Sequence, residues 1–203
     1  MQNLFPPLAW PQGPDRLPRQ DPASYTPQQA AAAAALIASP RGEVRGPFVP
    51  LMRSPELMDL TQQLGAFLRY RCSVPERLRE WAICLIARLW GQPYEWHAHA
   101  RLAHQAGVAR ATLAVLLAGE ETPPMTEDEA VIWRFITQLH AERFVSDAIW
   151  AETVALLSET GAVELSALCG YYTLLAMVLN VARVPVPGVA FALPGEAEQP
   201  LTS

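Results

Sequence analysis

The chain has 203 residues, a size that fits one domain or one domain with an extended arm. Its apolar share of 51% and charged share of 17% are those of a folded globular protein, and its net charge of −5 argues against a nucleic-acid-binding surface or a polybasic membrane anchor. All 15 basic residues are arginine, which excludes both a lysine Schiff base with pyridoxal phosphate and a P-loop lysine.

The N-terminal part of the chain is rich in proline, since 11 of the 19 prolines lie within residues 1–55. Each proline removes a backbone donor and restricts the residue before it, so long helices are not expected here. One short helix is predicted over residues 28–37, because Thr26 and Pro27 form a capping residue followed by proline at the first helical position. Residues 1–44 are therefore predicted to form an arm that lies on a surface and contains one short helix.

Helix follows helix in the rest of the chain. The predicted spans are 55–70, 75–90, 94–105, 109–118, a helix opened by the capping box at 126–129, 146–158 closed by Gly161, and 163–183. In the first of these, one apolar stripe is formed by Leu57, Leu60, Leu64, Phe67 and Leu68, whereas the helix over 75–90 is apolar nearly all round. No segment of useful length alternates with period two before the tail at 184–193. The sequence therefore predicts an all-α fold.

The cysteines and the apolar segments bear on the cellular compartment. Cys72, Cys84 and Cys169 are odd in number and form no C-x-x-C pair, so neither a zinc ribbon nor a dithiol redox motif of that type is encoded. No basic region followed by an apolar core opens the chain, and no signal peptide is expected. Residues 165–181 carry no charge but include polar side chains, which favours a central buried helix over a membrane span. We expect a cytoplasmic protein that binds neither membrane nor nucleic acid.

Two carboxylates and one imidazole are the strongest candidates for chemistry. Glu80 lies on the most apolar helix in the middle of the chain. Glu95 and His99 are four residues apart on the next helix, so they share a face, and Tyr94 and Trp96 flank the glutamate. A carboxylate and an imidazole that converge in an apolar cleft can hold a proton pair near neutral pH, as general acid–base catalysis requires.

Simpler interpretations of the same residues stay open from spacing alone. Glu95 and His99 fit an ordinary helix-surface pair, and Glu80 fits an ion-paired surface residue. A metal site is not expected, because the E-x-H-x-H pattern through His97 splits its ligands between two faces of the helix. Cys84 lies one turn after Glu80 and either points into the same region or serves as a small buried hydrophobe.

A resemblance to a known family gives these residues more weight. The segments that carry it are REWAICL at 79–85, WGQPYEWHAH at 90–99, AHQAGV at 103–108, LCGYY at 168–172, LN at 179–180 and VPVP at 184–187. In order and separation they resemble the carboxymuconolactone decarboxylase family, whose motifs are R-E-L-A-I-L, Y-E-W-x-x-H, A-x-x-A-G-L and G-Y-Y…N…V-P-x-P. The likeness covers residues 45–190 and leaves 191–203 as a C-terminal tail. It implies an alkyl hydroperoxidase D-like helical bundle.

The superfamily has two branches that the sequence separates. The alkyl hydroperoxidase D branch carries C-x-x-C-x-x-x-H, with a glutamate twelve residues before the first cysteine. Counted back from His99, the two cysteine positions are Glu95 and Gln92, and the upstream glutamate is Glu80. Peroxide reduction of that type needs an attacking and a resolving thiol, and neither is present at these positions. The resemblance therefore favours the decarboxylase branch, which has glutamate at the position of Glu95.

For that branch the resemblance implies an enzyme without a cofactor. It would remove carbon dioxide from a small carboxylated unsaturated lactone or a related product of aromatic ring cleavage. Glu80, Glu95 and His99 are the implied catalytic residues, with His99 oriented by one of the glutamates and returning a proton to carbon. The expected substrate contacts are Tyr94, Trp96, Trp81, Cys84 and Arg45. The arginine that anchors the substrate carboxylate stays open among Arg45, Arg77, Arg79 and Arg88.

Three alternative functions follow from the same pattern. An isomerase or tautomerase would use the same proton pair without loss of carbon dioxide. A peroxidase of the alkyl hydroperoxidase type comes next, and a non-catalytic binding protein that kept the fold comes last. In each case we expect a homo-oligomer, a trimer or a hexamer, with the arm of residues 1–44 packed across a neighbouring copy.

Overall fold

The computed structural model describes residues 13–119 and 122–195 together with Phe5 and Leu8. In this part of the chain the secondary structure is helical without strands, so the all-α prediction is confirmed. A short 3-10 turn, η1 (Pro22–Ser24), precedes the helices. The helices are α1 (Pro27–Ala38), α2 (Phe48–Leu51), α3 (Pro55–Tyr70), α4 (Glu76–Leu89), α5 (Pro93–Gln105), α6 (Arg110–Ala118), α7 (Glu127–Glu142) and α8 (Asp147–Ala182).

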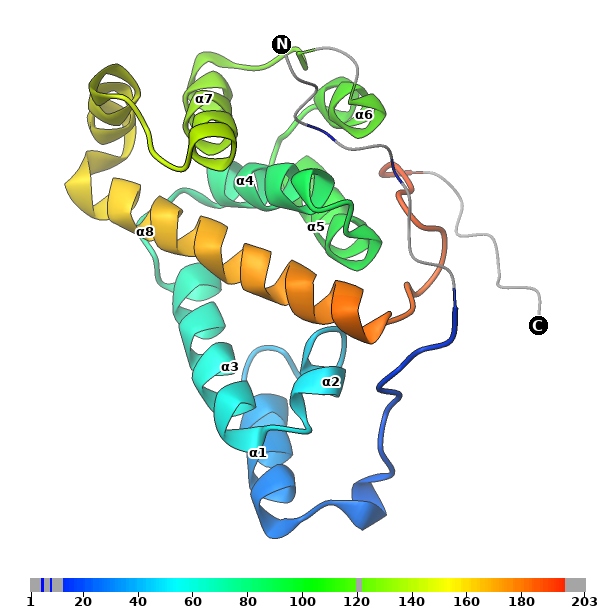
Figure 1. Ribbon diagram of the computed structural model, residues 1–203. Coiled ribbons are helices and arrows are strands. Elements are labelled where there is room, and N and C mark those ends of the chain that lie inside the picture. The colour runs from blue at the N-terminus through cyan, green and yellow to red at the C-terminus, as the bar shows by residue number, and fades with distance from the viewer. Residues whose placement is uncertain (1–4, 6–7, 9–12, 120–121, 196–203) are drawn as a thin grey trace.

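The long helix α8 crosses the molecule and separates two groups of helices. Figure 1 shows α4, α5, α6 and α7 on one side of α8 and α1, α2 and α3 on the other. Helix α4 packs against α5, α6, α7 and α8, and it is buried at every position from Glu80 to Arg88. This burial confirms the prediction that the helix is surrounded nearly all round, and it places Glu80 deep in the core.

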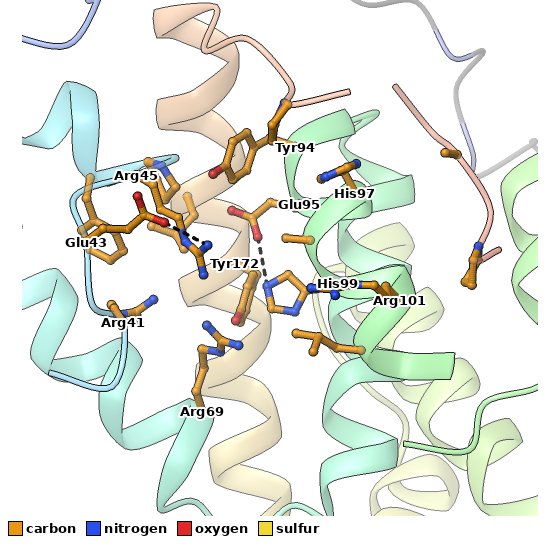
Figure 2. A pocket seen from close by; sticks show the side chains of 18 of the residues that line it. Arg41, Glu43, Arg45, Arg69, Tyr94, Glu95, His97, His99, Arg101 and Tyr172 are labelled. Atoms are coloured by element: carbon orange, nitrogen blue, oxygen red, sulfur yellow. Dashed lines mark hydrogen bonds and ion pairs between the residues drawn. The ribbon is translucent and has the colours of Figure 1, made fainter. Parts of the chain in front are cut away.

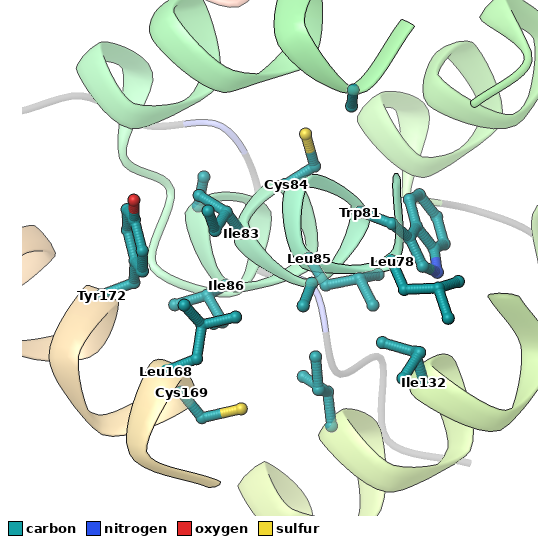
Figure 3. Close-up of a cluster of buried hydrophobic side chains, with 14 of the residues drawn as sticks. Leu78, Trp81, Ile83, Cys84, Leu85, Ile86, Ile132, Leu168, Cys169 and Tyr172 are labelled. Atoms are coloured by element: carbon teal, nitrogen blue, oxygen red, sulfur yellow. The ribbon is translucent and has the colours of Figure 1, made fainter. Parts of the chain in front are cut away.

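The main hydrophobic core forms around α4 (Figure 3). Leu78 and Ile86 of α4 lie in the same cluster as Ile132 of α7 and Leu168 of α8. A second cluster joins α1, α2 and the start of α3, with Leu36 and Phe48 among its most buried members. The two cores lie on opposite sides of α8, so α8 is the element that holds the two groups of helices in one domain.

Local sequence signals account for several helix starts. The side chains of Thr26 and Gln29 form a reciprocal capping box at the start of α1, and those of Thr126 and Glu129 do the same at α7. Each box satisfies backbone donors that the first turn of a helix leaves free. Proline occupies the first turn of α1, α3 and α5, where its missing N–H costs no hydrogen bond. These starts agree with the predicted spans within one residue.

The last helical region is divided at Ser158, the predicted end of the first of its two helices. α8 runs from Asp147 to Ala182 with a kink at Ser158, whose φ of 65° and ψ of 172° are not helical. The predicted role of Gly161 as the stop signal is wrong, because Gly161 lies inside the second helical segment, which begins before the predicted start at residue 163. An added Cβ there would lie 2.7 Å from the Cβ of Leu157, so the glycine reflects close packing rather than a helix stop. The short helix α2 was not predicted from the sequence.

Part of the apolar surface is uncovered. The predicted stripe of α3 divides in the structure: Leu57, Leu60 and Leu64 are 46%, 60% and 47% exposed, whereas Leu68 is fully buried. We refer to the three exposed leucines, together with the exposed side chains of Met177 and Val181 on α8, as the α3/α8 apolar face. Leu57, Met177 and Val181 line one groove of about 360 Å³.

Among the described residues, α8 is the one helix that is long and apolar enough to cross a membrane by length and composition. Half of its most apolar 18-residue window is buried inside the structure. Buried core helices meet the same two criteria, so length and composition do not distinguish a membrane span from a core helix.

Candidate active site

A cavity of about 510 Å³ lies beside α5. Its walls come from five parts of the chain: residues 40–48 before and into α2, the end of α3, residues 94–102 of α5, Tyr172 and Leu175 of α8, and the segment 187–195. Figure 2 shows the charged and aromatic side chains that point into it. A pocket of this volume that combines polar and apolar walls is of the size that holds a small ligand.

The turn between α4 and α5 is held to α8 by Gln92. The Gln92 side chain is fully buried, and its Oε1 accepts hydrogen bonds from the backbone N–H groups of Tyr94 and Glu95 at 2.5 and 3.4 Å. Its Nε2 donates to Oδ1 of Asn180 at 2.8 Å. Gln92 therefore caps α5 and fixes the rotation of this helix relative to α8, which sets the direction of the side chains one turn later.

His99 lies between two carboxylates, and all three side chains are at most 5% exposed. Nδ1 of His99 is 2.6 Å from Oε2 of Glu80, which reaches it from α4 behind the cavity wall. Nε2 is 3.4 Å from Oε2 of Glu95, which lines the cavity. The ring of Tyr172 meets the imidazole edge to face, with centroids 5.1 Å apart. The predicted convergence of the three titratable residues is therefore present in the structure.

The two carboxylates differ in proton affinity. Burial acts to raise the pKa of Glu80, but the charge of His99 and its hydrogen bond, with Arg69 and Arg79, outweigh burial and lower this pKa. Burial raises the pKa of Glu95, and the nearby charges of His99 and Arg69 only partly oppose it. Two carboxylates on one imidazole with pKa values shifted in opposite directions form a pair suited to proton transfer.

Four arginines line the cavity, at positions 41, 45, 69 and 101. Of the arginines predicted as anchors, Arg45 alone is in this set, and it pairs with Glu43 at 3.2 Å. Arg41 and Arg69 have no carboxylate partner within 4.0 Å in the described part of the chain, and the Nε of each is buried without a hydrogen-bond partner. Arg41 and Arg69 were not predicted from the sequence, because tertiary packing alone brings these distant segments to the site.

Arg41 is held by aromatic groups rather than by an acid. Its guanidinium lies 4.6 Å from the ring centroid of Phe48 and donates to the hydroxyl of Tyr171 at 3.4 Å. Gly65 makes room for this contact, since an added Cβ would lie 2.0 Å from the Tyr171 oxygen and 2.5 Å from Nη2 of Arg41. The charge of Arg41 is therefore oriented but not neutralised by the described residues.

Tyr94, a predicted substrate contact, lies on the cavity wall. Its ring packs on Gly46, which has a φ of +56° and where an added Cβ would lie 2.6 Å from the ring. This close approach links α5 to the loop that carries Arg45.

Three other predicted substrate contacts lie outside the cavity wall. Trp81 donates its indole N–H to the backbone oxygen of Glu129 at 3.1 Å and stacks on Trp133. Trp96 donates to the backbone oxygen of Ala192 at 3.0 Å. Cys84 is fully buried in the core, where burial and then the charge of Glu80 raise its thiol pKa well above the ordinary value. None of the three contacts the space that a ligand would occupy.

The remaining arginines predicted as candidate anchors also point elsewhere. Arg77 pairs with Asp128 and, at 2.6 Å, with Glu129. Arg79 and Arg88 donate to backbone oxygens at 3.3 and 3.0 Å, those of Val74 and Leu117 respectively. No group of three or more His, Cys, Asp or Glu side chains in the described residues is arranged to hold a metal ion.

Comparisons with known proteins locate this arrangement among folds. No protein-family model matches the sequence, and a search of curated proteins finds no significant match. Among solved structures, the alkylhydroperoxidase AhpD core of an uncharacterized peroxidase-related protein from Ralstonia eutropha JMP134 is similar, with a TM-score of 0.72. The match covers 93% of this chain and 100% of that chain at 14% sequence identity. The predicted alkyl hydroperoxidase D-like fold is confirmed, whereas similarity at this identity does not establish the reaction.

Proposed function

We propose that the protein is an acid–base enzyme without a cofactor, which decarboxylates a small carboxylated unsaturated lactone or a related ring-cleavage product. The observation that carries this proposal is the placement of His99 at the wall of a 510 Å³ cavity, with one carboxylate on each ring nitrogen. Because the pKa of Glu80 is lowered and that of Glu95 is raised, the first holds the imidazole and the second can exchange a proton at the cavity.

In the proposed reaction, the bond between the substrate carbon and its carboxylate breaks. The carboxylate leaves as carbon dioxide, and the bonding electron pair passes into the conjugated lactone, where negative charge collects on the carbonyl oxygen. His99 then gives a proton to the carbon and recovers one from water. Glu80 positions His99 through Nδ1 and stabilises the charged imidazolium, so that Nε2 faces the cavity and Glu95.

Arg41 is the group best suited to hold a carboxylate of the substrate. It lines the cavity with its charge unpaired by the described residues, and its orientation is fixed by Phe48 and Tyr171. A guanidinium already held in place binds a carboxylate with a smaller loss of side-chain entropy. This assignment replaces Arg77, Arg79 and Arg88, whose contacts lie away from the cavity.

The experiment that tests this proposal is a screen of lactone acids in which carbon dioxide release and ultraviolet absorbance are followed together, without added cofactor. His99→Ala is expected to lower turnover by roughly 10²–10⁴-fold, the usual contribution of a positioned general acid. His104→Gln is the matched control, since His104 is on the same helix but outside the cavity wall. An absorbance change without carbon dioxide would indicate an isomerase, and full turnover in His99→Ala would contradict the proposed site.

We also propose that the chain works as a cytoplasmic homo-oligomer, a trimer or a hexamer. Support comes from the α3/α8 apolar face, where five large apolar side chains are at least 46% exposed. Apolar patches of this kind often mark contacts between protein chains.

A further inference from the structure

Two hydrogen-bond donors on the cavity wall remain unused by the acid–base chemistry. Tyr172 of α8 and Arg69, in the last turn of α3, both line the cavity, and Figure 2 shows Tyr172 lying between Arg69 and His99. Neither the Tyr172 hydroxyl nor the Arg69 guanidinium makes a hydrogen bond to another described residue. Tyr172 as a whole residue is only 2% exposed, but its hydroxyl is not enclosed by other atoms, so this donor is accessible from the cavity.

Both groups remain donors at neutral pH. Burial raises the pKa of the Tyr172 hydroxyl well above its ordinary value, with Arg69 opposing and the acidic neighbours reinforcing the shift. For Arg69, burial acts to lower the pKa, but electrostatic interactions with Tyr172 and Tyr70, and then with Glu80 and Glu95, raise it. The site therefore holds a neutral O–H and a permanent positive charge side by side, next to the imidazole.

We propose that Tyr172 and Arg69 form an oxyanion site, which binds the carbonyl oxygen of the substrate as negative charge develops on it. This inference rests on the proposed function, and it assigns protonation of the substrate carbon and binding of the substrate oxygen to two different groups of residues. His99 delivers the proton to carbon, while the Tyr172 hydroxyl and the Arg69 guanidinium donate hydrogen bonds to oxygen. No new bond to the protein forms, and the electron pair released with carbon dioxide stays on the substrate until the carbon is protonated.

The surroundings explain why this oxygen needs donors other than His99. Glu80 and Glu95 occupy both ring nitrogens of His99, so the imidazole is committed to the proton relay. The two carboxylates also make this end of the cavity unfavourable for a developing negative charge unless a cation offsets them. Arg69 is the cation whose charge is felt by both glutamates. Donors fixed before the reaction contribute more than solvent, which would have to reorient.

The first test uses 4-nitrophenol, whose ionised form is distinguished by its colour and which does not depend on the natural substrate. The protein is expected to bind the phenolate more tightly than the neutral phenol and to lower the apparent pKa of the bound probe. Tyr172→Phe, which removes one oxygen atom, is expected to weaken phenolate binding at least tenfold, and Arg69→Gln more strongly. Tyr25→Phe is the control, since Tyr25 packs against the second hydrophobic cluster outside the cavity.

The second test measures the reaction on whichever lactone acid is turned over. Tyr172→Phe is expected to lower kcat by roughly 10²–10³-fold, the usual effect of removing one oxyanion donor, with little change in KM. Circular dichroism and thermal melting establish that Tyr172→Phe and Arg69→Gln are folded. A merely structural tyrosine would change the melting temperature and leave the ratio of phenolate to phenol affinity unaltered.

The two tests separate this proposal from the proposed function. If no lactone acid reacts but Tyr172→Phe still loses phenolate affinity, the reaction is wrong and the oxyanion site stands. If the parent turns over a lactone acid and Tyr172→Phe equals it in kcat and phenolate binding, the oxyanion site is refuted. Loss of phenolate binding in Arg41→Gln but not in Tyr172→Phe would also overturn the assignment, because the anion would then sit at Arg41.

Discussion

Replacement of Glu80 by glutamine is expected to destabilise the fold strongly at neutral pH. Glu80 accepts a charge-assisted hydrogen bond of 2.6 Å from His99, and its side chain is 3% exposed. Hydrogen bonds to charged groups contribute about 1.5–3 kcal/mol, so we expect a loss of about 2–3 kcal/mol in the free energy of unfolding. For a chain of this size, that loss corresponds to a fall of roughly 4–12 °C in melting temperature.

The pH dependence has a defined sign for each glutamate. Because the pKa of Glu80 is lowered in the folded state, its contribution is complete above pH 4.5, its ordinary pKa, and is lost as the pH falls through the lowered value. The pKa of Glu95 is raised, so its ionisation opposes folding as the pH rises above 4.5. The difference in free energy of unfolding between the parent and Glu80→Gln should therefore shrink below pH 4.5. For Glu95→Gln, the free energy of unfolding should increase relative to that of the parent as the pH rises above 4.5.

Urea unfolding of the parent, Glu80→Gln and Glu95→Gln at several pH values, at one fixed protein concentration, tests this reasoning. Glu95→Gln is the matched control, since it removes the same charge from the other side of His99. Equal losses for both variants at pH 7, or a gap for Glu80→Gln that does not change with pH, would refute the assignment of opposite pKa shifts.

Two further predictions follow from other parts of the structure. The Cys84→Ala variant is expected to consume peroxide at the same rate as the parent in an assay with a dithiol donor. The reason is that Cys84 lies outside the cavity and burial raises the pKa of its thiol. Abolished activity in Cys84→Ala would identify Cys84 as a reactive thiol. Leu60→Asp, on the α3/α8 apolar face, is expected to lower the molar mass measured by light scattering, with Phe144→Asp as an exposed apolar control outside that face. A parent that is monomeric at micromolar concentration would contradict the proposed assembly.

The helices could be predicted from sequence because their signals are local. Capping boxes at Thr26 and Thr126 and prolines in first turns fix where helices begin, and glycine gives a weaker signal for where they end. Gly161 shows that weakness, since the residue serves close packing against Leu157 rather than helix termination. The predicted stripe of α3 is correct only in part, since Leu68 is buried while Leu57, Leu60 and Leu64 are exposed. Periodicity indicates an apolar face but does not show whether the same chain covers it.

The site residues that lie together on one helix could be predicted from the sequence, whereas most of those on other elements could not. Glu95 and His99 share a face by spacing, and the structure joins both to Glu80. Trp96 was expected beside Glu95 for its position in the sequence, but consecutive helical residues differ by about 100° in direction, so it points to Ala192 instead. Arg69 lies on α3 and had no local signal, because only tertiary packing brings it to the cavity beside α5.

The replacements at the two cysteine positions of the peroxidase pattern change what this fold can do. Gln92 occupies the first position and uses its side chain to cap α5 and to bind Asn180. Glu95 occupies the second, 3.4 Å from His99 Nε2, where a thiol would otherwise face the histidine. A thiolate attacks a peroxide, whereas a buried carboxylate with a raised pKa exchanges protons. The proposed chemistry of this helix pair is therefore proton transfer at His99, because neither of the two positions that carry thiols in the cysteine pattern carries one here.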